Sequence, residues 1–156
     1  SENDNSVGGK IRCFATNVPP GLGSPFFDSF ESVLSHLMFS IPAIKGIEFG
    51  KGFDLAGLSG AESNDAYYNE GQGIKSYTNN NGGILGGITN GMPLDFSVVI
   101  KSTPSIGKSQ NTVTKVGKEN TKIEVHGRHD PCILPRALPV IESVAALTIL
   151  DFLLDN

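Results

Sequence analysis

Cysteine is scarce in this sequence, and several signals of a secreted or membrane protein are missing. The two cysteines, Cys13 and Cys132, are too few for the disulfide framework of a small secreted domain. The sequence contains no N-x-S/T glycosylation sequon and no apolar run of membrane-spanning length, and its N-terminus is polar, unlike a signal peptide. These absences favour a cytoplasmic protein.

Charge is also sparse, and neither sign is in large excess. Charged residues make up 18% of the chain and the formal net charge is −4, so no basic field favours nucleic acid and any anion site must be local. Hydrophobic residues make up 38% of the 156 residues, which is enough for a core and fits one domain. We therefore expect residues 1–156 to form a single domain that binds neither nucleic acid nor a membrane.

Hydrophobic periodicity in the first half of the chain predicts a strand, a helix, a strand and a loop. Residues 10–19 alternate apolar and polar side chains, as a half-buried strand does. Residues 25–40 repeat apolar side chains at helical spacing, with Ser24 as the expected N-cap. Residues 44–58 are typical of a strand broken by glycines, and residues 59–83 of a long polar loop.

The second half predicts a hairpin, a second loop and a long helix. Residues 82–101 are typical of two short strands joined by a turn at Asn90-Gly91, and residues 101–127 of a loop that ends in a short strand. Residues 135–155 predict a helix that is apolar nearly all round and therefore buried on more than one side. This order of elements predicts an α+β fold with a mainly antiparallel sheet and helices packed on it.

The first segment with chemical potential is glycine-rich and covers residues 79–87, "NNNGGILGG". Paired glycines let a backbone approach a ligand closely and leave N–H groups free for an anion. The segment is not a dinucleotide fingerprint, because the glycine spacing differs and a strand rather than a helix follows. By spacing alone, a glycine-rich entry into a hairpin is slightly favoured.

The second segment, "KSTPSIGKS", covers residues 101–109. It is not a Walker phosphate loop, because Ser102 stands where that motif needs its first glycine and no helix is predicted after it. A looser phosphate site would draw charge from Lys101 and hydroxyl donors from Thr103 and Ser105. A solvated loop is the commoner explanation for such a composition.

The third segment, "HGRHDPC", covers residues 126–132. Its histidines, aspartate and cysteine are all types that bind metals, but their spacing matches no defined zinc motif, so we expect no metal site. An acid–base role for Asp130 fits better, with Arg128 holding a phosphate or a carboxylate. A polar loop with an internal salt bridge remains the alternative.

Taken in order, these segments resemble the C-terminal half of the chorismate synthase family. The resemblance covers nearly the whole chain and rests on long motifs. The motifs are "SVGGKIRCFATNVPPGLGSPFFD" (6–28), "SIPAIKGIEFGKGF" (40–53), "SNDA" (63–66), "TNNNGGILGGITNGMPL" (78–94), "KSTPSI" (101–106) and "GRHDPCILPRALPVIESVAAL" (127–147).

The resemblance implies a function and a fold. Chorismate synthases catalyse the last step of the shikimate pathway, which leads to the aromatic amino acids. They convert 5-enolpyruvylshikimate 3-phosphate to chorismate and phosphate by a 1,4-anti elimination that needs reduced FMN without net electron transfer. The family forms homotetramers with a β-α-β sandwich core, so this chain is expected to be one half of such a sandwich.

The resemblance also implies roles for individual residues. Asp130 matches the aspartate that assists proton movement at the flavin. Ser102 departs from the family, in which proline commonly follows the lysine, and this puts the phosphate contacts of that turn in doubt. The residues expected to contact FMN are Pro42, Ala43, Gly86, Lys101, Ser102, Thr103, Pro104, Ser105 and Arg128.

The N-terminal half of the family is not represented in this chain. In the family that half carries two catalytic histidines and most of the arginines that bind the phosphorylated substrate. His126 and His129 do not match those histidines and do not inherit their role. Two functions therefore remain open: part of an FMN-dependent lyase, or an inactive half that serves as a scaffold or assembly module.

Overall fold

The centre of the fold is a three-stranded antiparallel sheet. The computed structural model describes residues 4–71, 73–127 and 129–155. Strand β7 (Leu94–Ile100) lies between the edge strands β1 (Gly9–Ala15) and β2 (Ile44–Phe49). The predicted α+β class with a mainly antiparallel sheet is confirmed.

Strand β7 is central because both of its faces are suited to burial. Every residue of the strand except Val99 is buried. Leu94, Phe96, Val98 and Ile100 join the hydrophobic core on one face, whereas Asp95 and Ser97 are buried among polar partners on the other. β1 alternates instead, as an edge strand with one solvated face does, with Ile11 turned inward and Arg12 outward.

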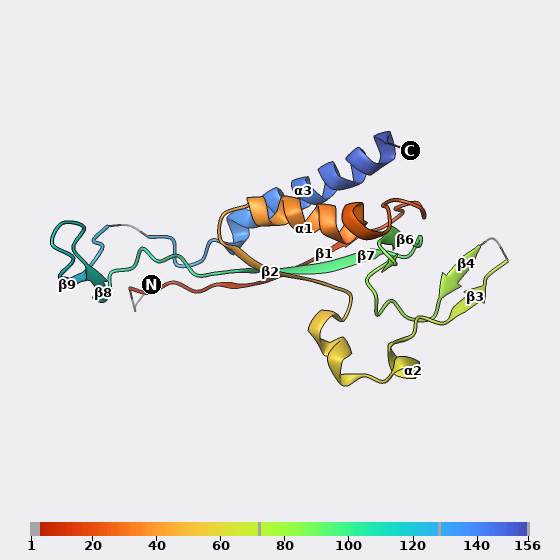
Figure 1. Cartoon of the computed structure of the whole chain (residues 1–156), viewed down its shortest axis with the longest axis horizontal. Helices are drawn as coiled ribbons and strands as arrows, with labels where there is room; N and C mark the ends of the chain where they lie inside the picture. Colours follow the sequence, from red (N-terminus) through yellow and green to blue (C-terminus); the bar gives the residue numbers. More distant parts are fainter. Residues whose placement is uncertain (1–3, 72, 128, 156) are drawn as a thin grey trace.

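Two helices, α1 (Phe30–Ser40) and α3 (Leu134–Leu154), cover the core face of the sheet side by side (Figure 1). The rings of Phe30 and Phe152 stack between them at a centroid distance of 5.1 Å. The helices bury residues at helical spacing, which are Phe30, Leu34 and Met38 in α1 and Ile141, Ala145 and Thr148 in α3. The predicted helices are both present, and together with the sheet they enclose the core.

Helix α1 begins five residues later than predicted. Pro25 is extended rather than helical, and a short 3-10 turn over Phe26–Asp28 separates it from the helix. The N-cap is Ser29 instead of Ser24, because the Ser29 side chain accepts a hydrogen bond of 3.0 Å from the backbone N–H of Ser32. The apolar spacing was therefore a correct sign of a helix, but the cap was assigned to the wrong serine.

The segment predicted as a polar loop at residues 59–83 contains regular structure. It includes the helix α2 (Gly60–Ser63) and a hairpin of β3 (Tyr67–Asn69) and β4 (Ile74–Ser76). The preceding segment, expected to continue β2, forms a 3-10 helix over Gly52–Gly57 instead. The β3–β4 hairpin projects from one end of the molecule (Figure 1).

A second hairpin projects from the opposite end (Figure 1). It pairs β8 (Gln110–Val113) with β9 (Asn120–Ile123), and it lies within the region expected to be a loop with a short strand. Its residues are exposed apart from Gln110, which is half-buried. Both hairpins are rich in polar and β-branched residues, so periodicity of core contacts could not reveal them.

The hairpin predicted at Asn90-Gly91 is instead turned at Gly86-Gly87. There β5 (Ile84–Leu85) pairs with β6 (Ile88–Thr89), and both turn glycines have positive φ. Asn90 fails as a hairpin turn because its side-chain oxygen accepts a hydrogen bond of 3.0 Å from Met92 N–H, a local turn that leads into β7.

Helix α3 has the predicted length of 21 residues and begins one residue earlier than predicted. An 18-residue window of its 21 residues has a mean hydropathy of 1.9, so by length and composition it could cross a membrane, contrary to the expectation above. Such a helix is weak support for a membrane span, since the core helix of a soluble protein meets the same criterion. One side of α3 packs on the core, and apolar side chains on the rest are exposed, including Leu147, Leu150 and Leu154.

Candidate functional site

The expected cofactor contacts at residues 42–43 and 101 lie together at one end of the sheet. Pro42 and Ala43 form the turn between α1 and β2. The backbone N–H of Lys101 donates a hydrogen bond of 2.9 Å to the carbonyl oxygen of Ala43, so the two segments leave the sheet as neighbours. Ala43 has a φ of +75°, a conformation that few alanines adopt, and this fixes the direction of the turn.

The segment from Ser102 to Ser105 continues away from β7 and is held through its backbone. Ser6 Oγ donates to the Thr103 carbonyl at 2.6 Å, and Gln110 Nε2 donates to the Pro104 carbonyl at 3.1 Å. These bonds use carbonyl oxygens, and the side chains of Ser102 and Ser105 remain exposed to solvent. Exposed hydroxyls next to the Lys101 ammonium form a donor set suited to an anion.

Asp130 reaches the same end of the molecule from the other side. The Thr103 hydroxyl lies 3.5 Å from the Asp130 carbonyl oxygen. The Asp130 carboxylate forms an ion pair with Arg136 in the first turn of α3, and the two side chains are 45% and 77% exposed. Solvent can therefore reach a carboxylate that is nevertheless held in place. Arg128 lies outside the described residues.

The two histidines of this segment have different surroundings. A ring nitrogen of His129, Nε2, lies 2.8 Å from the Val125 carbonyl oxygen, which fixes the ring against its own loop. His126 is exposed, and its ring nitrogen lies 3.9 Å from Glu124. Within the ranges that the structure describes, no three His, Cys, Asp or Glu side chains gather as metal ligands would.

A polar groove of about 410 Å³ runs between these segments. Three stretches of chain form it: the N-terminal segment, the turn after Pro104 and the loop before α3. The lining residues are Asp4, Asn5, Ser6, Ser105, Ile106, Gly107, Val125, His126, Gly127 and His129. The structure thus joins three segments that are separated in the sequence into one hollow.

Gly86 does not belong to this group. It occupies the tip of the β5–β6 hairpin, where the Gly87 carbonyl accepts a hydrogen bond of 2.8 Å from Phe30 N–H at the start of α1. Pro42 follows the other end of α1, and the 11 residues of that helix span about 16 Å. Within this chain the expected contacts therefore form two groups at opposite ends of α1.

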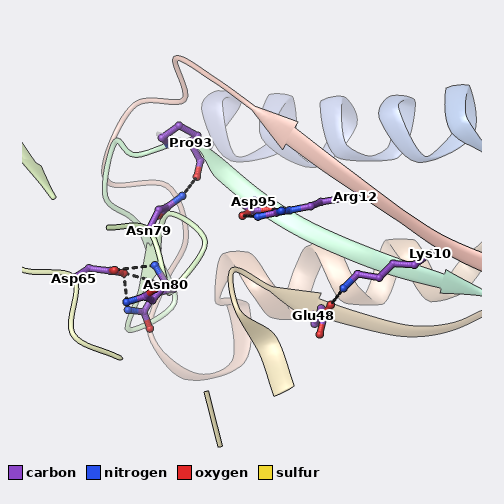
Figure 2. Close-up of polar contacts among 9 residues, drawn as sticks. Lys10, Arg12, Glu48, Asp65, Asn79, Asn80, Pro93 and Asp95 are labelled. Atoms are coloured by element: carbon purple, nitrogen blue, oxygen red, sulfur yellow. Dashed lines mark hydrogen bonds and ion pairs between the residues drawn. The ribbon is translucent and has the colours of Figure 1, made fainter. Parts of the chain in front are cut away.

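Sequence reasoning missed a buried carboxylate near the Gly86 hairpin. Asp65, which lies beside Asn80 in Figure 2, is 4% exposed and accepts hydrogen bonds from Thr78, Asn80 and Asn81. Burial acts to raise the pKa of Asp65, but these hydrogen bonds outweigh it and lower the pKa below its ordinary value. The only signal in the sequence was the pairing of "ND" with the later asparagine run "NNN".

A second set of charges lies on the face of the sheet that the helices leave open (Figure 2). Arg12 on β1 donates two hydrogen bonds, of 2.9 and 2.6 Å, to the carboxylate of Asp95 on β7, and its guanidinium lies 4.6 Å from the Phe14 ring centre. Lys10 pairs with Glu48 across the sheet, and its hydrogen bond is the main cause that lowers the Glu48 pKa. The Arg12–Asp95 pair ties β1 to the central strand, and the Lys10–Glu48 pair ties the two edge strands to each other.

Comparisons of the sequence and of the structure with known proteins point to the same family. The family profile described as "Chorismate synthase" matches residues 1–154. A solved structure described as "Crystal Structure of Chorismate Synthase" superimposes on 99% of this chain with a TM-score of 0.78 and 34% identity, and 39% of that chain is covered.

Curated relatives called chorismate synthase come from bacteria, archaea and plants. The protein of Dehalococcoides mccartyi is 46% identical over 154 residues, and that of Methanococcus maripaludis is 46% identical over 155 residues. The chloroplastic protein of Capnoides sempervirens is 48% identical over 150 residues, which is 96% of this chain and 33% of the relative. The matches to the Dehalococcoides and Methanococcus relatives cover 99% of this chain but only 42% of each relative.

Proposed function

Because the chain belongs to the chorismate synthase family, we propose that it is the C-terminal part of an enzyme that makes chorismate and phosphate from 5-enolpyruvylshikimate 3-phosphate. The observation that supports this best is the match over residues 1–154 together with the shared fold. The enzyme is then a carbon–oxygen lyase of the shikimate pathway, working in the cytoplasm as a homotetramer. Residues 1–156 are one structural domain of it.

The donor set at the end of β7 fits the phosphate end of FMN. The Lys101 ammonium supplies charge, and the exposed Ser102 and Ser105 hydroxyls supply donors beside a polar groove of about 410 Å³. Arg128 and the turn at Pro42 and Ala43 are proposed to complete the contacts. Reduced FMN, when bound, supplies transient electron density for the elimination and an acceptor for the substrate proton.

Asp130 is proposed to handle that proton. Its carboxylate is open to solvent yet fixed by the ion pair with Arg136, so it can accept or release a proton at a defined place. The neighbouring Thr103 hydroxyl, 3.5 Å from the backbone carbonyl oxygen of Asp130, links the Asp130 backbone to the proposed phosphate loop.

The rest of the enzyme is proposed to come from the N-terminal region of the family, which this chain lacks. Two structural features support that partner. The contacts near Lys101 and at Gly86 form two groups at opposite ends of α1, and apolar side chains of α3 such as Leu147 are exposed, at 60%. A second, similar half packed on α3 would cover this surface and complete the site.

The alternative function is an inactive half that acts as a scaffold or assembly module. The division of the expected flavin contacts into two groups favours it for the chain by itself. The two functions differ in what happens when the missing region is supplied.

Turnover measured with and without that region tests the proposal. The chain alone, with reduced FMN and substrate under anaerobic conditions, is expected to release no phosphate. Mixing it with the N-terminal region of the Dehalococcoides relative should form a complex and restore phosphate release. A stable complex that binds FMN but stays silent would contradict the enzymatic proposal and leave the scaffold.

A further inference from the structure

The Asp65 carboxylate accepts four hydrogen bonds, two at each oxygen. Oδ1 accepts from the Thr78 hydroxyl at 2.6 Å and from Asn80 N–H at 2.7 Å. Oδ2 accepts from the backbone N–H of Asn81 at 3.0 Å and from its side-chain amide at 2.8 Å. We call these four residues, Asp65, Thr78, Asn80 and Asn81, the Asp65 clasp.

A second pair of hydrogen bonds runs from Asn80 back to the chain just before Asp65. The Asn80 side-chain amide donates to the carbonyl oxygens of Glu62 and Ser63, at 3.3 and 3.2 Å. The chain entering Asp65 and the turn at Asn80 therefore hold each other, with Asp65 and Asn80 4% and 5% exposed (Figure 2).

Only an ionised carboxylate fits this position. All four groups that face Asp65 are donors, and an amide offers one acceptor oxygen and an NH₂ group that would meet donors. No ion pair to Asp65 occurs among the described residues, so hydrogen-bond dipoles alone hold the charge. The role of this buried carboxylate therefore lies in the turn that it holds in place.

The turn that it holds leads directly to the Gly86 hairpin. Asn79 Nδ2 donates to the Pro93 carbonyl at 2.8 Å, which attaches the turn to the start of β7. A side chain at Gly82 would lie 2.5 Å from the Asp95 carbonyl oxygen, and one at Gly83 would lie 2.6 Å from that of Pro93. The backbone from Asn79 to Gly83 is therefore closely packed, with no room for a side chain at Gly82 or Gly83.

Beyond this packed turn the hairpin tip is open. Gly86 has a φ of +60°, and a side-chain carbon built there would meet nothing within 4 Å. Leu85 beside it is 37% exposed. A firmly held base with an open tip is suited to presenting backbone groups to a ligand.

We propose that Asp65 is a positioning residue for the flavin site, which fixes the turn at residues 78–83 so that the β5–β6 hairpin presents Gly86 to the cofactor. This inference rests on the proposed function, since Gly86 is a flavin contact only if the chain serves the lyase.

Hydrogen exchange and FMN titration of Asp65→Asn test the proposal. In the 156-residue chain, amide exchange over residues 78–89 should become about tenfold faster, while exchange in β1 and β7 changes little. In the complex with the N-terminal region, the variant should bind FMN about tenfold more weakly, because the turn at the base of its hairpin loses the hydrogen bonds of the Asp65 clasp. Glu70→Gln, which also removes one carboxylate charge but lies in the exposed β3–β4 hairpin, is the matched control and should behave as wild type.

Thr78→Val provides a milder variant in case Asp65→Asn unfolds, since it removes a single donor from the clasp. It should shift both measurements in the same direction by a smaller factor. Faster exchange confined to residues 78–81, or spread equally over the sheet, would overturn the positioning role. Equal FMN affinity in wild type and variants would overturn this inference alone, whereas no FMN binding by the wild-type complex would overturn the proposed function with it.

Discussion

Two aspartates show how surroundings divide roles between residues of the same type. Asp65 is buried, has both oxygens occupied by donors, and has a lowered pKa, so its proton is lost and its geometry is fixed. Asp130 is half-exposed and, among the described residues, pairs with one cation, Arg136, so its carboxylate has room to meet a substrate or a cofactor. A carboxylate that holds structure and one that handles protons need opposite environments.

Replacing Asp130 tests the second of these roles. In the complex with the N-terminal region, Asp130→Asn should lower turnover at least about 100-fold, or about 2.7 kcal/mol of barrier, with FMN affinity nearly unchanged. Stability should hardly fall, because an exposed ion pair contributes about 0–1 kcal/mol. Single-turnover kinetics and flavin titration measure the two effects, with Asp151→Asn on α3 as the control. Wild-type turnover in Asp130→Asn would remove Asp130 from the mechanism.

At the scale of elements, the cap of helix α1 is Ser29 and not Ser24, the serine predicted from the sequence. Ser29→Ala should lower the free energy of unfolding by about 1 kcal/mol, because the Ser32 N–H loses its acceptor. Ser24→Ala should change it by less than about 0.5 kcal/mol, since Ser24 lies outside the helix and is exposed. Denaturant titrations of the two variants compare them directly, and equal losses would mean that the helix begins earlier than observed.

The elements also show what the sequence could and could not predict. Strands and helices with one apolar face were found, since residues such as Leu34 and Ile11 repeat with the period of their element. The hairpins at both ends were missed because their side chains face solvent or each other, as Tyr68 and Tyr77 do at 4.5 Å. The turn at Gly86 was missed because Asn90-Gly91 carries the stronger local signal and tertiary bonds overrule it.

The motifs predicted which residues belong to the candidate site, but they did not predict that these residues form two separate groups. Residues near Lys101 and residues near Asp130 meet because β7 ends and α3 begins at the same side of the sheet, which the order of elements alone leaves undetermined. The separation of Gly86 from them follows from the length of α1 and the hydrogen bond between Phe30 and Gly87. Asp65 lies in the motif "SNDA", but its role was not predicted because it depends on a turn that follows it by more than ten residues.

At the scale of the whole molecule, the exposed side of α3 predicts how the chain associates. Leu147→Glu should change the stability of the chain alone by less than about 0.5 kcal/mol, because Leu147 is already 60% exposed. It should weaken association with the N-terminal region at least about tenfold, since a charge would then be buried in an apolar contact. Val116→Glu, in the connection between β8 and β9, adds the same charge at an 89% exposed site and should leave association unchanged. Sedimentation or light scattering of the mixtures would show this, and equal association of both variants would place the interface elsewhere.

The position of β7 in the chain sets the order in which the sheet can form. Both edge strands pair with β7 and not with each other, yet both precede it in the sequence. Gly9 therefore cannot pair with Ile100 until that residue has been synthesised. During synthesis, β1, α1 and β2 therefore leave the ribosome with unpaired strand edges and an uncovered apolar face. Closing so long a loop is slow compared with forming a local hairpin. Until residue 100 has been made, those strand edges stay unpaired and prone to aggregation.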